Sequence, residues 1–219
     1  MISSHRKSKT LHDLILFDLD GTISDPLEGV SRSINFALTH FGHQSRAVAE
    51  IAQYVGPSLD STFKSLIGND TETTALVAKY RDRYGEIGYS ENILYPGIAT
   101  ALSAINAANI PMAICTAKRQ DFAERIIDMF GLSHYFQFIN GGEVGISKSQ
   151  QIEFLLAQKQ VSNSTVMIGD RAVDLIAAHQ NGLQSGGVLW GYGSRTELAH
   201  EAPLYFFNSP SELTQLAPY

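Results

Sequence analysis

The chain has 219 residues, of which 44% are hydrophobic and 17% charged, and 22 acidic against 16 basic residues give a net charge of −6. This composition is that of a globular protein and excludes a fibre or a disordered tail, while the length allows one large domain or a core with a modest insert. The basic residues are scattered along the chain, which argues against a nucleic-acid partner.

The first predicted element is a short strand. Residues 1–10 are polar and basic and lead into only a short apolar run without a small-residue cleavage site, so we expect no signal peptide and no membrane-spanning segment. The residues from Leu14 to Phe17 form a continuous apolar run that ends at Asp18. Such a run is typical of a strand buried on both faces of a parallel sheet. We therefore expect Asp18 at the carboxyl end of this strand.

The segment between residues 23 and 95 is too long for a simple crossover between two strands. Asp25-Pro26 predicts a helix start, with the aspartate as N-cap and the proline in the first helical position. Three apolar stripes at helical spacing follow, and a glycine ends each of them. We therefore predict an inserted, all-helical cap of residues 23–92 and a core of residues 1–22 and 93–219.

Short apolar runs recur at residues 112–115, 136–139, 166–168 and 187–190, and helix-like segments separate them. This alternation predicts an α/β fold with a doubly wound parallel sheet. The single cysteine, Cys115, lies in the first of these runs. We expect a buried core thiol and, because no disulfide can form within the chain, a reducing, cytoplasmic location.

Polar residues that end the apolar runs are the candidates for a functional site, because ligands bind beyond the carboxyl ends of the strands in open α/β sheets. They are Asp18, Thr116 and Asp170. Asp174 follows at a predicted helix start, and Lys148 lies in the loop before another predicted helix. These side chains are expected to gather at one edge of the sheet.

The segment Asp18-Leu19-Asp20-Gly21-Thr22 carries the most specific signal. An Asp-x-Asp pair alone is a weak signal, since turn-forming and capping acids are common. Gly21 permits a tight turn with exposed N–H groups, and Thr22 adds a hydroxyl. Together they predict a small concavity that binds an anion.

With these motifs, the sequence resembles the haloacid dehalogenase-like hydrolases, specifically phosphatases similar to phosphoglycolate phosphatase, over nearly the whole chain. The first motif is residues 18–22, the second is Thr116 with Ala117 and Lys118, the third is Lys148 and the fourth is residues 169–174. Lys159, predicted inside a helix, is the one nearby competitor for the third motif. The resemblance implies a Rossmann-like core with a small helical cap.

The resemblance also implies a role for each matching residue. Asp18 would be the nucleophile that attacks phosphorus, and Asp20 would protonate the leaving oxygen and later activate water. Thr116 would hold a phosphoryl oxygen, and Lys148 would bridge the nucleophile and the phosphoryl group. The residues expected to contact the substrate are Gly21, Thr22, Ala117 and Lys118.

A magnesium ion is the expected cofactor, and no other cofactor is expected. By the same resemblance, Asp18, the backbone carbonyl of Asp20 and the carboxylate of Asp170 would bind Mg²⁺, while Asp174 would support these ligands. The physical need for a cation is clear, because these carboxylates face a phosphomonoester that adds roughly two more negative charges. The crowding of carboxylates should raise the pKa of Asp20 and keep it partly protonated.

The predicted partner is a small phosphorylated metabolite, either 2-phosphoglycolate or a nucleoside 5′-monophosphate. Within the resemblance, the segments 25–26, 55–57 and 191–194 slightly favour a nucleotidase. A sugar-phosphate phosphomutase and a phospho-accepting signalling domain are the alternatives, and both a monomer and a homodimer are compatible with the sequence. Segment 56–58 is either an ordinary turn or a loop that closes over substrate, and we interpret Tyr80, Tyr84 and Tyr89 as core side chains of the cap.

Overall fold

The computed structural model describes residues 12–68, 71–143 and 145–217. Within these residues, six strands form one parallel sheet in the order β5-β4-β1-β6-β7-β8. In chain order, leaving out two short strands described below, this is the 3-2-1-4-5-6 order of the Rossmann fold. The predicted α/β sheet is confirmed. The strands are β1 Ile15–Phe17, β4 Met112–Arg119, β5 Phe136–Gly142, β6 Val166–Gly169, β7 Gln184–Val188 and β8 Tyr205–Phe207.

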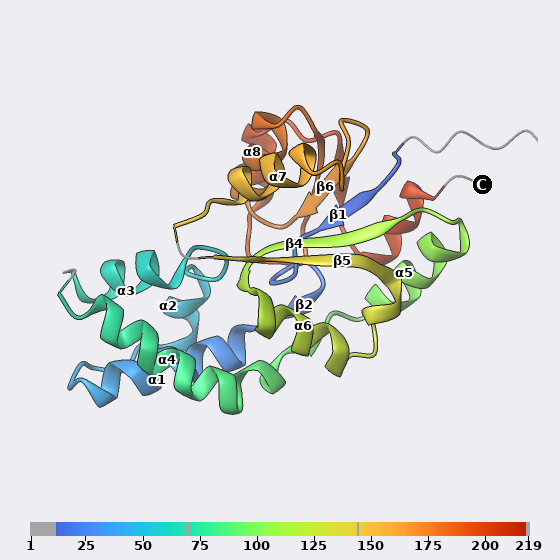
Figure 1. Cartoon of the computed structure of the whole chain (residues 1–219). Coiled ribbons are helices and arrows are strands. Elements are labelled where there is room, and N and C mark those ends of the chain that lie inside the picture. The colour runs from blue at the N-terminus through green and yellow to red at the C-terminus, as the bar shows by residue number, and fades with distance from the viewer. Residues whose placement is uncertain (1–11, 69–70, 144, 218–219) are drawn as a thin grey trace, which may run out of the picture.

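Helices cover both faces of this sheet (Figure 1). Alternate side chains of β1 and of Leu14, which precedes it, explain why: Ile15 and Phe17 are buried with α5 and α6, whereas Leu14 and Leu16 are buried with α7 and α8. A strand that packs on both faces must be apolar throughout, as the sequence is. The helices are α5 Ile98–Ala107, α6 Gln120–Met129, α7 Lys148–Ala157, α8 Ala172–Gln180 and α9 Arg195–His200, with the 3₁₀ helices η2 Ser133–Tyr135 and η3 Pro210–Leu216.

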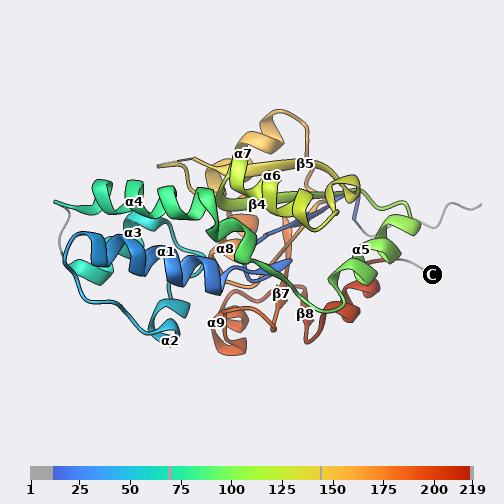
Figure 2. The ribbon, with the colours of Figure 1, turned by 90° about the horizontal axis from the view of Figure 1, so that it is seen from below.

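A two-stranded antiparallel ribbon leads out of the core, because β2 Ser24–Asp25 pairs with β3 Ile93–Leu94. The chain between these strands forms helices that lie together beside the sheet (Figures 1 and 2). We call residues 27–91 the helical segment. It has its own cluster of buried side chains, which includes Phe122 of α6. Its elements are α1 Leu27–His40, α2 Val48–Ala52, α3 Leu59–Ile67, α4 Thr73–Glu86 and the 3₁₀ helix η1 Gly88–Glu91.

Two details of the helical segment differ from the sequence prediction. Helix α1 begins at Leu27 with Pro26 as its N-cap, one residue later than expected, although Asp25 Oδ1 does accept the Leu27 N–H at 2.9 Å. Helix α2 was not predicted, because its five residues are too few to display an apolar stripe. Cys115 is buried and unpaired, as expected. None of the described helices is both long and apolar enough to cross a bilayer.

Candidate active site

Three neighbouring strands bring the predicted residues of the sheet edge together. Strand β1 pairs with β4 on one side and with β6 on the other, so that Phe17 lies between Ile114 and Ile168. Asp18 follows Phe17 directly, and Thr116 and Asp170 each lie two residues beyond the partners of Phe17. The parallel register therefore places these three side chains at one edge of the sheet.

Lys148 reaches this edge from the first turn of α7. The helix begins there because the Ser147 hydroxyl accepts the Gln150 N–H and the Gln150 side chain accepts the Ser147 N–H. Lys148 Nζ lies 2.8 Å from Asp18 Oδ1 and donates a hydrogen bond to Asp174 Oδ1. Burial lowers the pKa of Lys148, but the charges of Asp174 and Asp18 outweigh it and hold that pKa above its ordinary value. Lys159 is exposed and lies beyond the end of α7, so it does not compete for this position.

The carboxylates of Asp18, Asp170 and Asp174 form a compact, buried cluster. Each offers an oxygen within 4.8 Å of the others. Both oxygens of Asp174 already accept hydrogen bonds, one from Lys148 and one from the Arg171 N–H at 3.1 Å. Burial, followed by the charge of Asp18, raises the pKa of Asp174 to about 6 despite the opposing charge of Lys148.

Unsatisfied oxygens in this cluster fit a divalent cation. Among the described residues, Asp170 Oδ1 is buried without a hydrogen-bond partner, and Asp18 Oδ1 is buried with only the Lys148 ammonium beside it. The other oxygen of Asp170 accepts the Tyr192 N–H at 2.7 Å. Buried acceptors without donors are costly, and carboxylate oxygens are the ligands that Mg²⁺ prefers. The donor set of Asp18 and Asp170 is therefore suited to Mg²⁺, with Asp174 already engaged by the protein.

Asp20 lies beside this cluster and is paired with Lys118. Asp20 Oδ2 is 2.9 Å from Lys118 Nζ, whereas Asp20 Oδ1 is buried and has no hydrogen-bond partner in the described part of the chain. The predicted rise in the pKa of Asp20 is confirmed, but its cause differs from the expectation. Burial is the largest cause of the rise in this pKa. The charge of Lys118 opposes the rise, and the charge of Asp18 adds to it by less than either of these effects.

The tight turn after Asp20 places Gly21 against Asp170. Gly21 has a φ of +82°, and a Cβ at this position would lie 2.1 Å from Asp170 Oδ2. Only glycine fits both the backbone conformation and the space. The Thr22 hydroxyl is buried without a hydrogen-bond partner among the described residues, so it packs behind the site.

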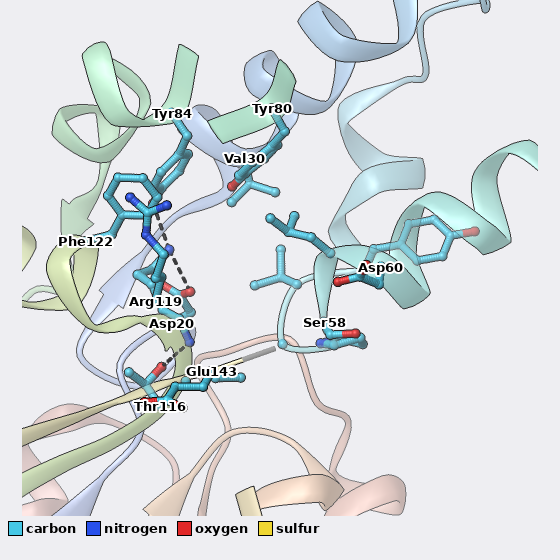
Figure 3. A pocket seen from close by; sticks show the side chains of 18 of the residues that line it. Asp20, Val30, Ser58, Asp60, Tyr80, Tyr84, Thr116, Arg119, Phe122 and Glu143 are labelled. Carbon is cyan, nitrogen blue, oxygen red and sulfur yellow. Dashed lines mark hydrogen bonds and ion pairs between the residues drawn. The ribbon is translucent and has the colours of Figure 1, made fainter. Parts of the chain in front are cut away.

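A cavity of about 740 Å³ opens between the sheet edge and the helical segment (Figure 3). Of the predicted site residues, its described walls include Asp18, Asp20, Thr116, Ala117 and Lys118, whereas the other five are not among the lining residues. These five are Gly21, Thr22, Lys148, Asp170 and Asp174. The helical segment and the loops near it contribute Val30, residues 54–60, Tyr80, Arg81 and Tyr84, and the core adds Arg119, Phe122, residues 142–143 and residues 145–147.

Segment 56–58, which the sequence left as a turn or a substrate loop, lines this cavity. The neighbouring Val55 carbonyl accepts a hydrogen bond from Arg171 Nη1 at 2.8 Å. Arg171 directly follows Asp170, so this contact ties the loop to the carboxylate cluster.

Two tyrosines at the site were missed by sequence reasoning. The loop of Gly191, Tyr192 and Gly193 wraps Asp170, and a Cβ at Gly191 would lie 2.4 Å from the Asp170 Cβ. The segment 191–194 was the available signal, but the sequence prediction used it only to favour a nucleotidase and gave Tyr192 no place at the site. Tyr84 meets Lys118 through its hydroxyl, and its place in an apolar stripe concealed this polar contact.

Comparison with known proteins agrees with this geometry. A family model described as haloacid dehalogenase-like hydrolase matches residues 15–188. A 5′-nucleotidase from Pseudomonas aeruginosa is 34% identical over 207 residues, which cover 92% of this chain and 94% of that protein. Tyrosine-protein kinase PtkA from Mycobacterium tuberculosis is 33% identical over 184 residues, which cover 82% of this chain and 63% of that protein. The crystal structure of a predicted phosphatase from Clostridium acetobutylicum gives a TM-score of 0.87 at 32% identity and covers 93% of this chain and 97% of that one.

Proposed function

The chain belongs to the haloacid dehalogenase-like hydrolase family, and from this premise we propose that it is a magnesium-dependent phosphomonoester hydrolase that works through an aspartyl-phosphate on Asp18. One observation carries the proposal. The buried Asp18 carboxylate is paired with Lys148 and clustered with Asp170, and Asp18 and Asp20 line the wall of a cavity. A nucleophile, a cation, an acid and a set of free carboxylate oxygens thus converge where a phosphate would sit.

In the first step, a bond forms between an oxygen of Asp18 and phosphorus while the bond from phosphorus to the leaving oxygen breaks. Asp20 gives its proton to that oxygen, so the product leaves as an alcohol. In the second step, Asp20 takes a proton from the water that attacks the aspartyl-phosphate, which releases inorganic phosphate and restores Asp18. Lys148 and Thr116 would hold phosphoryl oxygens during both steps.

Mg²⁺ would be held by Asp18, the backbone carbonyl of Asp20 and Asp170. When bound, it would supply positive charge that offsets the carboxylates and the substrate phosphate. Asp174 would keep Lys148 and the Arg171 backbone in place, through the two hydrogen bonds it accepts from them. Lys118 and Ala117 would meet the substrate at the cavity wall, with Gly21 and Thr22 shaping the turn behind them.

We propose a nucleoside 5′-monophosphate as the leading substrate class, with 2-phosphoglycolate as the second. The cavity of about 740 Å³ is far larger than 2-phosphoglycolate requires, and its walls include the aromatic side chains of Tyr54, Tyr80, Tyr84 and Phe122. A similar protein is named a 5′-nucleotidase. Residues 23–92 would act as a cap that opens for exchange of substrate and product and closes to exclude water.

The alternatives differ in what accepts the phosphoryl group from Asp18. A phosphomutase would pass it to a sugar phosphate, a signalling domain would retain it, and the relative named a tyrosine-protein kinase is named for transfer to tyrosine. Asp20 supports water as the acceptor, because its Oδ1 has no hydrogen-bond partner among the described residues and could serve as a general base.

The test is phosphate release from a panel of nucleoside monophosphates, 2-phosphoglycolate and sugar phosphates, with Mg²⁺ or with EDTA. The wild type is compared with Asp18→Asn and with Asp128→Asn, which neutralises an exposed aspartate outside the site. We expect Mg²⁺-dependent release from the wild type and from Asp128→Asn, and a loss of at least about 10³-fold in Asp18→Asn. Absence of release from every substrate, or unchanged release by Asp18→Asn, would contradict the proposal.

A further inference from the structure

The ammonium group of Lys118 is buried, and among the described residues it contacts two polar side chains. Its side chain is 7% exposed, and its Nζ lies 2.9 Å from Asp20 Oδ2. The same Nζ donates to the Tyr84 hydroxyl at 2.7 Å and lies 4.5 Å from the centroid of the Tyr84 ring. A buried ammonium group needs such partners, because its desolvation is costly. The position of Lys118 is therefore set jointly by Asp20 and Tyr84.

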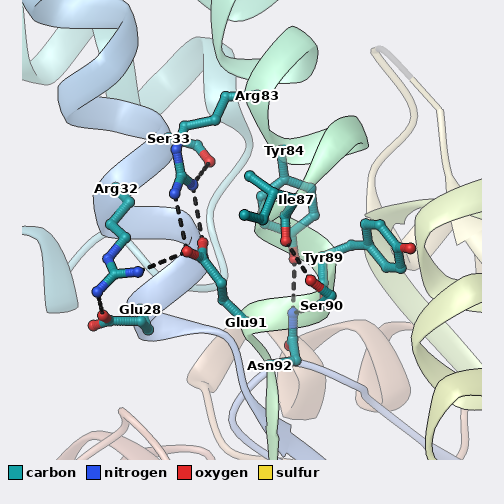
Figure 4. Close-up of polar contacts among 10 residues, drawn as sticks. All are labelled: Glu28, Arg32, Ser33, Arg83, Tyr84, Ile87, Tyr89, Ser90, Glu91 and Asn92. Atoms are coloured by element: carbon teal, nitrogen blue, oxygen red, sulfur yellow. Dashed lines mark hydrogen bonds and ion pairs between the residues drawn. The ribbon is translucent and has the colours of Figure 1, made fainter.

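Tyr84 is itself fixed by its surroundings in the helical segment and at the ribbon. Its ring stacks on Tyr80 at 5.2 Å between centroids and meets Phe122 edge-on at 5.1 Å. Its hydroxyl oxygen accepts a second hydrogen bond, from Asn92 Nδ2 at 3.0 Å (Figure 4). The orientation of the Asn92 amide is defined, since Nδ2 also donates to the Tyr89 carbonyl and Oδ1 accepts from the Ser24 hydroxyl of β2.

Arg83, which precedes Tyr84 on α4, holds another side of this helix in place. Arg83 donates two hydrogen bonds to Glu91, both at 2.9 Å, and Glu91 also pairs with Arg32 of α1 (Figure 4). The carboxyl end of α4 is thus held to α1 and to η1. Tyr84 projects from this end of α4 towards Lys118, so the position of the Lys118 ammonium depends on the position of α4.

The contact between Tyr84 and Lys118 differs from other polar contacts that join the core to the helical segment. Arg125 donates to the Gly85 carbonyl and Arg171 donates to the Val55 carbonyl, so each ends on the backbone. Tyr84 instead continues through Lys118 to Asp20. Because Lys118 engages Oδ2 of Asp20, the carboxylate is held with Oδ1 unpartnered among the described residues. Oδ1 is thus the atom available to carry a proton to the leaving oxygen.

We propose that Tyr84 is a positioning residue for this reaction: through Lys118 it orients the Asp20 carboxylate, and it does so only while α4 is docked on the core. The inference rests on the proposed function, in which Asp20 protonates the leaving group. Closure of the helical segment would then do more than exclude water. It would complete the geometry of the proton donor.

The test compares two phosphomonoesters that differ in how much they need a proton donor. An alkyl phosphate, such as a nucleoside 5′-monophosphate, needs protonation of its leaving oxygen, whereas 4-nitrophenolate leaves readily without it. In Tyr84→Phe the ring contacts remain and the hydroxyl is lost. We expect kcat/KM, which reports only the steps up to formation of the aspartyl-phosphate, to fall about 10- to 100-fold for the alkyl phosphate and less than about threefold for 4-nitrophenyl phosphate, since in those steps only the alkyl phosphate depends on general-acid catalysis.

Two further variants make this result interpretable. Lys118→Gln should show the same difference between the two substrates, in addition to any loss that both share because Lys118 contacts the substrate, and it also tests the inference if Tyr84→Phe fails to fold. Tyr89→Phe is the control. It removes a hydroxyl of the helical segment that makes no hydrogen bond to the described residues, and it should leave both rates unchanged. Thermal melting of each variant confirms that it is folded.

An equal loss for the two substrates in both Tyr84→Phe and Lys118→Gln would overturn the inference in favour of a purely structural role, as would unchanged rates in both variants. If the wild type hydrolyses neither substrate, the proposed function itself fails, and the inference fails with it. That result is distinct from the others, because it is visible before any variant is made.

Discussion

The edge of the sheet and the helical segment differ in how far their charged side chains are exposed to solvent. At the edge, the side chains of Lys148 and Asp18 are 4% and 6% exposed and are surrounded by further carboxylates. On α1, the paired side chains of Arg32 and Glu28 are 58% and 44% exposed. Buried charges cost stability and persist where they serve chemistry, whereas exposed pairs contribute little. Substitutions of charged side chains at the edge should therefore alter activity first, and substitutions of the ion-paired side chains in the helical segment should alter stability first.

The largest expected effect tests the edge. Asp20→Asn should lower turnover about 10²- to 10⁴-fold, because the amide cannot donate or accept the proton that the reaction requires. Binding of Mg²⁺ should remain largely intact, since the expected ligand from this residue is its backbone carbonyl. Steady-state kinetics and isothermal titration with Mg²⁺ measure the two effects. Near-normal turnover would remove Asp20 from the mechanism.

A pair of glycines sharpens the comparison between the two regions. Gly21 at the edge has a φ of +82° and no room for a Cβ beside Asp170, whereas Gly42 after α1 has a φ of +81° with nothing within 4 Å of an added Cβ. Gly21→Ala should weaken Mg²⁺ binding about 10- to 100-fold by displacing Asp170. Gly42→Ala should leave Mg²⁺ binding unchanged and cost only about 1–2 kcal/mol of stability from backbone strain. Equal effects on Mg²⁺ affinity would show that strain alone, and not the clash with Asp170, is responsible.

The smallest expected effect lies at the carboxyl end of α4. Glu91→Gln should lower the free energy of unfolding by about 1 kcal/mol near pH 7, because it weakens the hydrogen bonds and ion pairs with Arg83 and Arg32 while leaving the cavity intact. Hydrogen bonds from Arg83, more than any other contact, lower the pKa of Glu91 below its ordinary value of 4.5. A lowered folded-state pKa means that this stabilisation is present above about pH 4.5 and is lost as the pH falls through the folded-state pKa.

Denaturant unfolding of wild type and Glu91→Gln at a series of pH values measures this. The difference in stability should shrink as the solution is acidified from pH 5 to pH 3. A difference that stays constant over this range would show that the charge of Glu91 is not its source.

Local sequence patterns predicted those parts of the molecule that depend on a single strand or helix. The apolar run of β1 is buried on both faces of the sheet, and that run placed Asp18 at the strand end. Lys148 was expected in a loop and instead opens α7, because the Ser147 and Gln150 capping contacts start the helix at this residue. The boundaries of the cap at residues 23 and 92 remain a prediction.

The remaining parts depend on contacts between distant segments, which local patterns do not encode. The Tyr192 N–H that holds Asp170 is a backbone group, and no residue type signals it. Tyr84 was interpreted as a core side chain, and its ring is indeed buried with Tyr80 and Phe122. Its hydroxyl acquires a role only because α4 docks against the strand that carries Lys118. Likewise, the rise in the pKa of Asp20 was foreseen, but its main cause is burial, which depends on the folded chain.

The central claim is that Asp18 accepts the phosphoryl group. The most direct measurement mixes Asp20→Asn with Mg²⁺ and 4-nitrophenyl phosphate, whose leaving group needs no proton from Asp20, quenches the mixture with acid and maps phosphorylation by mass spectrometry of peptides. Without Asp20 to activate water, the aspartyl-phosphate should accumulate on Asp18, and it should be absent when Asp18 is also replaced by Asn. Phosphorylation of another residue, or of none while the wild type still releases phosphate, would contradict the account.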